Sequence, residues 1–208
     1  MDDSRADEQN RDRLTALSDG IFAIAMTLLV LDIRVTGGLD PAGFRHMVRA
    51  LLPKIAAYAL SFTILAGLWR DHRRILQLAR RMDTVSVRLT LAGLGVIALL
   101  PFPTTLLSEY ASQPLAVAGY AATIVVIDLL QLAILLRVWR DPQQPYAVPR
   151  SVGRTIVADL GSTVLVFGAT VPIAFASPAA ALWSWLALVP IRFALGRGAG
   201  ARGGRAAG

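Results

Sequence analysis

Six apolar segments restrict the fold classes that this chain can adopt. They make it 55% hydrophobic, with a mean hydropathy of +0.55, which is too apolar for an ordinary soluble domain. A helix of about 20 apolar residues crosses the roughly 30 Å hydrocarbon core of a bilayer. We therefore predict an all-α membrane protein with six transmembrane helices. The segments lie at about 14–35, 51–69, 86–107, 115–138, 153–176 and 179–195.

The basic residues predict how these helices are oriented. All but four of the 21 Lys and Arg residues lie at the two ends of the chain or in the loops after the second and fourth segments. Loops rich in Lys and Arg stay in the cytoplasm, so both termini are expected there. This pattern also explains the net charge of +7, and no nucleic-acid partner is expected. The chain has no cysteine, which excludes disulfides and thiol chemistry.

The chain divides into three parts. Residues 1–12 are polar and mixed in charge, are expected to be mobile, and do not resemble a signal peptide. Residues 13–195 hold the six-helix transmembrane domain, and the Gly/Ala/Arg tail at 196–208 is expected to be disordered.

Two local signals mark breaks between helices. Asp40 followed by Pro41 predicts the start of a short interfacial helix within residues 36–50. Pro101 and Pro103 must kink or end the third helix near its outer third.

The first transmembrane segment has two different faces. At about 100° per residue, one stripe consists of Ile24, Leu28 and Leu31, with Thr27 at its edge. The roughly opposite face carries Asp19, Phe22 and Met26. Apolar stripes on membrane helices most often face lipid or the packed core, so the stripe alone does not identify a site.

A polar cluster, Arg13, Ser18 and Asp19, lies just before the first apolar run. Trp69 and His72 end the second segment at the same depth and share a helix face. A charge at the mouth of a membrane helix is costly without a partner, and Arg, Trp and His can donate hydrogen bonds to Asp. We therefore predict a polar network that locks the first helix against the second.

These residues resemble a known family. The pattern Arg13-x-x-x-Leu17-Ser18-Asp19 is similar to the RxxxFSD signature of the transmembrane protein 175 family of potassium channels, with Leu17 where the family has Phe. The pair Trp69-x-x-His72 and the proline run of the third segment resemble two further blocks of the family. The resemblance covers roughly the first half of the chain.

The resemblance implies a potassium-permeable cation channel in a multi-pass membrane protein of the bacterial inner membrane. It implies a homotetramer in which the first helices surround one axis, with lipid and other copies of the chain as partners. The permeant species would be potassium ions, with no cofactor. The residues that would line the narrow apolar pore, which gates by dewetting, are Ile24, Thr27, Leu28 and Leu31.

A second hypothesis is a proton-coupled secondary transporter. Asp128 and Asp159 fall inside the fourth and fifth apolar runs, where acids are functional candidates, and Asp19 and His72 could join them. Asp128 could serve an ion path or bond to a structural partner such as Gln131. The missing repeat between the two halves of the chain argues against a transporter built from inverted repeats.

Asp159 could pair with Arg154, with Arg150 or with a basic group of a neighbouring helix. A structural membrane protein remains a third hypothesis, for which no sequence feature discriminates. An enzyme is not expected, because the sequence has no nucleophile–base set, phosphate loop or metal-ligand spacing.

Overall fold

A computed structural model describes residues 2–79, 82–141 and 150–185, with side chains described from residue 8 onward except at Arg150. Within these residues the chain is helical, and five stretches are long and apolar enough to cross a membrane, with α3 and α4 counted together. The predicted sixth segment begins in α7, and its residues from 186 onward lie outside the described residues, as does the 196–208 tail. The elements are α1 (Asp2–Leu28), the 3-10 helix η1 (Leu29–Asp32), α2 (Pro41–Leu78), α3 (Thr84–Leu99), α4 (Pro101–Glu109), α5 (Pro114–Arg140), α6 (Arg150–Ala176) and α7 (Pro178–Ser184).

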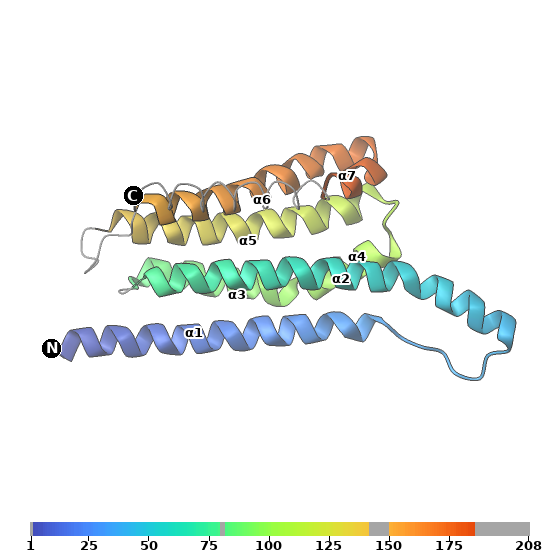
Figure 1. The fold of residues 1–208 in the computed structure, drawn as a ribbon, viewed down its shortest axis with the longest axis horizontal. Coiled ribbons are helices and arrows are strands. Elements are labelled where there is room, and N and C mark those ends of the chain that lie inside the picture. The colour runs from blue at the N-terminus through green and yellow to red at the C-terminus, as the bar shows by residue number, and fades with distance from the viewer. Residues whose placement is uncertain (1, 80–81, 142–149, 186–208) are drawn as a thin grey trace, which may run out of the picture.

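The long helices lie side by side in a bundle (Figure 1). α1 forms one edge and packs against α2 and α3, whereas α5 and α6 pack together on the other side. α5 also contacts α2, α3, α4 and α7, and is therefore the central helix. Its Tyr120 ring lies 5.2 Å from the ring of Trp185 and 6.4 Å from that of Phe167, so aromatic packing fills this part of the core.

α1 differs from its predicted bounds at both ends. It begins at Asp2, so the polar segment continues the helix, which corrects the predicted start near residue 14. Neither Gly nor Pro occurs among residues 2–12, and acidic side chains favour a helix N-terminus. The last turn tightens into η1, which ends at Asp32.

α2 is one continuous helix of 38 residues. Asp40 caps its N-terminus, because the Asp40 carboxylate accepts a hydrogen bond from the Gly43 backbone N–H at 2.8 Å. The prediction of a separate interfacial helix is therefore wrong, since residues 41–50 form the first turns of α2. Pro53 lies inside this helix, and α2 bends where it extends beyond the bundle (Figure 1).

The predicted break in the third segment lies at Leu100, between α3 and α4, with Pro101 as the first residue of α4. Buried hydroxyls brace this break against two other helices. Thr104 Oγ1 lies 3.0 Å from Ser61 Oγ of α2, which lies 3.0 Å from Tyr120 Oη of α5. The break is thus fixed within the bundle by hydrogen bonds.

Asp83 joins the beginning of α3 to the end of α5. Its side chain caps α3 by accepting from the Ser86 backbone N–H at 3.0 Å, and it accepts from Arg137 Nη2 at 2.6 Å. The hydrogen bonds from Ser86 and then Arg137 lower the pKa of Asp83 to about 2. The carboxylate is therefore charged at neutral pH.

Candidate functional site

The rotation of α1 places its aliphatic stripe outside the bundle. Ile24 is 59% exposed and Leu31 63% exposed, and Thr27 and Leu28 are exposed as well. By contrast, the side chains packed inward are Phe22, Ala25 and Leu29, each at most 2% exposed. The Thr27 hydroxyl donates to the Ile24 carbonyl at 2.8 Å, which leaves its oxygen as an acceptor on this open face.

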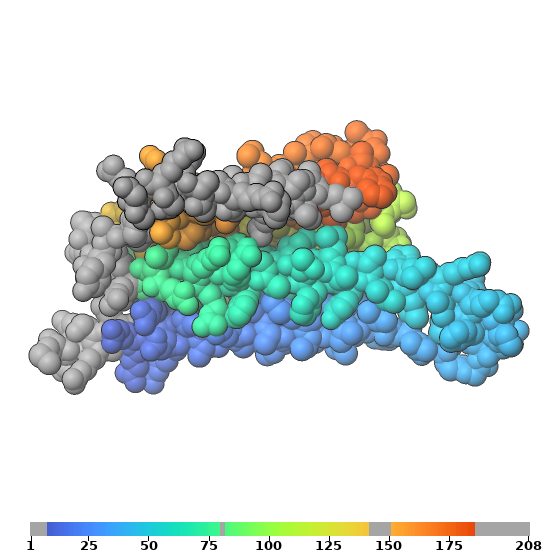
Figure 2. All heavy atoms as spheres, viewed as in Figure 1, coloured from blue at the N-terminus to red at the C-terminus, as the bar shows by residue number. Residues whose placement is uncertain are grey.

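In the space-filling view α1, in blue, forms the lower edge of the molecule (Figure 2). Leu17, which stands where the transmembrane protein 175 signature has Phe, is 46% exposed and belongs to the same stripe. A larger side chain at this position would change the contacts that the stripe makes outside the subunit. It would not change the packing within one subunit. The stripe is free to contact lipid, another subunit or the lumen of a pore.

A hydrogen bond at the buried edge of α1 ties it to α2. Trp69 Nε1 donates to Asp19 Oδ1 at 2.7 Å, and both side chains are half-buried. A distance of 2.7 Å is short for an N–H donor, as is typical of a carboxylate acceptor. It fixes the height and rotation of α1 relative to α2.

A second bond lies about one turn further along α2, toward its C-terminal end. The Ser18 hydroxyl donates to the Leu14 carbonyl at 2.8 Å, and Ser18 Oγ lies 3.1 Å from His72 Nε2. Because the hydroxyl proton is used on Leu14, His72 Nε2 carries a proton and donates to Ser18. Both residues are buried, and the His72 ring lies 5.6 Å from the ring of Phe22. We call these two hydrogen-bonded pairs, Asp19 with Trp69 and Ser18 with His72, the polar anchor. The imidazole therefore links the polar anchor to the apolar core.

Arg13 lies outside this network. It is exposed, and among the residues that the structure describes it has no hydrogen bond or ion pair. A different arginine contacts the anchor, because the Arg73 guanidinium lies 5.4 Å from the centroid of the Trp69 ring. The spacing of four residues between Trp69 and Arg73 on one helix is the sequence signal for this contact.

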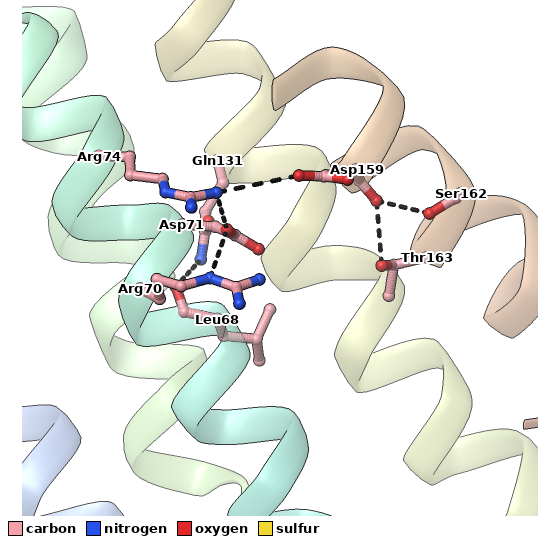
Figure 3. A network of polar contacts seen from close by, with 8 residues as sticks. All are labelled: Leu68, Arg70, Asp71, Arg74, Gln131, Asp159, Ser162 and Thr163. Carbon is pink, nitrogen blue, oxygen red and sulfur yellow. Dashed lines mark hydrogen bonds and ion pairs between the residues drawn. The ribbon is translucent and has the colours of Figure 1, made fainter. Parts of the chain in front are cut away.

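The opposite side of α2 carries a second polar cluster (Figure 3). Asp71 is 1% exposed and accepts from Arg70 Nε at 3.4 Å and from Arg74 Nη1 at 3.5 Å. Arg74 Nη1 also lies 3.9 Å from Asp159 Oδ2 of α6. Asp159 is thus paired with a basic group of a neighbouring helix, one of the alternatives left open by the sequence.

Asp128 and Gln131 are both buried on α5. Gln131 Nε2 donates to the Leu68 carbonyl of α2 at 3.3 Å, so this side chain ties the central helix to α2 (Figure 3). Within the described residues, no group of three His, Cys, Asp or Glu side chains could hold a metal ion.

The fold and this site define a multi-pass α-helical membrane protein whose first helix presents an open aliphatic face and is anchored to α2 by hydrogen bonds. Comparison with known proteins identifies the family within this class of membrane proteins. The family profile described as "Endosomal/lysosomal potassium channel TMEM175" matches residues 13–101. A potassium channel of Streptomyces collinus is 35% identical over 174 residues, which span 79% of this chain and 82% of that protein. The chain belongs to the TMEM175 family.

Further relatives agree with this assignment. A potassium channel of Chamaesiphon minutus is 36% identical over 131 residues, which span 62% of this chain and 64% of that protein. The crystal structure of a lysosomal potassium-selective channel TMEM175 homologue from Chamaesiphon minutus superposes with a TM-score of 0.78 at 24% identity. It covers 90% of this chain and 98% of that chain, so the two share a fold.

Proposed function

We propose that this protein is a potassium-permeable cation channel that conducts passively through a pore formed by α1 of each subunit. The observation that carries the proposal is the open aliphatic face of α1, at Ile24 and Leu31, in a member of the TMEM175 family. The relatives from Streptomyces collinus and Chamaesiphon minutus are potassium channels. A passive channel needs a continuous pore and no catalytic group, which fits this site.

The pore requires more than one subunit. Four copies of α1 around one axis form a closed cyclic assembly, and the homotetramer would turn the exposed stripe toward that axis. Ile24 and Leu31 would then form two apolar collars roughly 12 Å apart, since η1 rises more steeply than an α-helix, with Thr27 and Leu28 between them. Branched side chains offer no hydrogen bonds to replace those of water, so such a collar gates conduction by dewetting.

The polar anchor has a positioning role in this proposal. The bonds from Trp69 to Asp19 and from His72 to Ser18 act within the two turns that precede Ile24. They resist rotation of α1 about its own axis, because a turn of the helix would break both bonds. The direction in which Ile24 points is therefore set by contacts outside the pore.

The proposed location is the bacterial inner membrane, with six transmembrane helices and both termini in the cytoplasm. The bias of basic residues supports this topology. Single cysteines at residue 3 or within 199–208 are expected to react with an impermeant thiol reagent only from the cytoplasmic side, since the chain has no other cysteine. Labelling of either position from outside would contradict the topology.

The function is tested in proteoliposomes in which potassium or sodium is the sole permeant cation. We expect potassium flux down its gradient that does not saturate with a substrate and needs no proton gradient. A proton-coupled transporter working through Asp128 and Asp159 would instead saturate and would follow the proton gradient. Flux of this second kind would contradict the channel.

A further inference from the structure

Arg13 lies on the same line of α1 as the proposed pore face. The helix is unbroken from Asp2 to Leu28, so the eleven residues from Arg13 to Ile24 return to nearly the same direction, within about 20°. Leu17, exposed, lies between them on this line. At Gly20, also between them, an added Cβ would meet nothing within 4 Å, so the surface is open along this stretch.

Among the side chains that the structure describes, no acidic group of the same subunit pairs with Arg13. Its neighbours on this face one turn away, Gln9 and Leu17, are uncharged. The nearby carboxylates are engaged elsewhere: Asp12 accepts from Arg11 Nη2 at 3.1 Å, and Asp19 accepts from Trp69. Among the described residues Arg13 has no ion pair, so its full charge acts on whatever this face borders.

We propose that the Arg13 side chains of the four subunits form a basic ring at the pore mouth on the side of the N-terminus, where they reduce the entry of cations. This proposal rests on the proposed pore. Eleven residues place the ring about 16 Å along the axis from the Ile24 collar. Four guanidinium groups repel one another and require water, so the ring lies in a hydrated vestibule.

The expected effect follows from local concentration. A positive potential of about one kT at the mouth reduces the cation concentration there roughly 2.7-fold. Salt screens such a ring, because the Debye length falls from about 30 Å at 0.01 M to about 8 Å at 0.15 M. The ring therefore reduces the potassium current that enters from the N-terminal side, and it does so mainly at low salt. An arginine with a purely structural role would produce neither the dependence on direction nor the dependence on salt.

The test compares Arg13→Gln with Arg11→Gln in excised membrane patches. Both variants remove one positive charge, but Arg11 lies about 160° around the helix and is bonded to Asp12. We expect Arg13→Gln to raise the potassium current that enters from the N-terminal side about twofold to threefold at 0.01 M salt, with little change at 0.5 M. Arg13→Lys, which keeps the charge, and Arg11→Gln are expected to match the parent protein.

Three results would overturn the ring. They are an increase that is equal in both directions, an increase that does not depend on salt, and loss of the assembled channel in Arg13→Gln while Arg13→Lys assembles. The last result would assign Arg13 to a contact between subunits. Absence of any cation current in the parent protein would instead contradict the proposed function itself, so the two failures are distinguishable.

Discussion

Ile24→Asn is expected to raise potassium flux per assembled channel and to leave assembly largely intact. The Ile24 side chain is 59% exposed in the subunit and is not packed between helices, so the substitution removes little packing. If it faces the pore, an amide in each of four subunits offers hydrogen bonds to water and wets the apolar collar. The measurement is potassium flux in proteoliposomes, divided by the amount of tetramer.

Leu29→Asn is the matched control for this prediction. Leu29 is 2% exposed and belongs to the core cluster that includes Phe22, Leu65 and Leu68. An unpaired buried amide costs about 1–3 kcal/mol in addition to the lost packing, so we expect a lower yield of assembled protein. If Leu29→Asn raised flux and Ile24→Asn only destabilised the protein, α1 would be rotated from the proposed orientation.

Asp19→Ala is expected to destabilise the protein by about 1–3 kcal/mol, because Trp69 Nε1 then loses its acceptor in a half-buried position. The loss should appear as a lower midpoint of thermal unfolding and a lower yield of assembled channel. Asp19→Asn keeps a carbonyl oxygen for the indole N–H and should be less destabilising.

A double-mutant cycle isolates this contact. Trp69→Phe removes the donor, so adding Asp19→Ala to Trp69→Phe should cost less than Asp19→Ala alone. Additive effects of the two substitutions would show that the bond contributes nothing to stability. An Asp19→Ala protein with unchanged stability and only an altered ion preference would contradict the positioning role.

Local signals in the sequence predicted several parts of this fold. The cap at Asp40 and the break before Pro101 follow from residue types that act within one turn, and both are confirmed. Helical periodicity predicted that Phe22 and Ile24 lie on roughly opposite faces of α1, and the structure buries Phe22 and exposes Ile24. The meeting of Trp69 with Asp19 required one further step, which was to place both residues at the same membrane depth.

Other parts depend on contacts that no local pattern encodes. The signal at Asp40 and Pro41 marks where a helix starts but does not say how far that helix continues. α2 continues through Pro53 because a bend in the helix can accommodate a proline. The pairing of Arg74 with Asp159 joins helices that are far apart in the chain. Arg13 was expected in the polar network, but the rotation of α1 turns it toward the open face.

Thiol modification of Ile24→Cys tests the proposed pore most directly, because the chain has no native cysteine. A charged thiol reagent should abolish potassium flux through Ile24→Cys channels and spare Leu165→Cys channels, whose substituted residue is 75% exposed on α6. Potassium flux that continues unchanged after complete modification of Ile24→Cys, verified by mass spectrometry, would contradict a pore lined by α1.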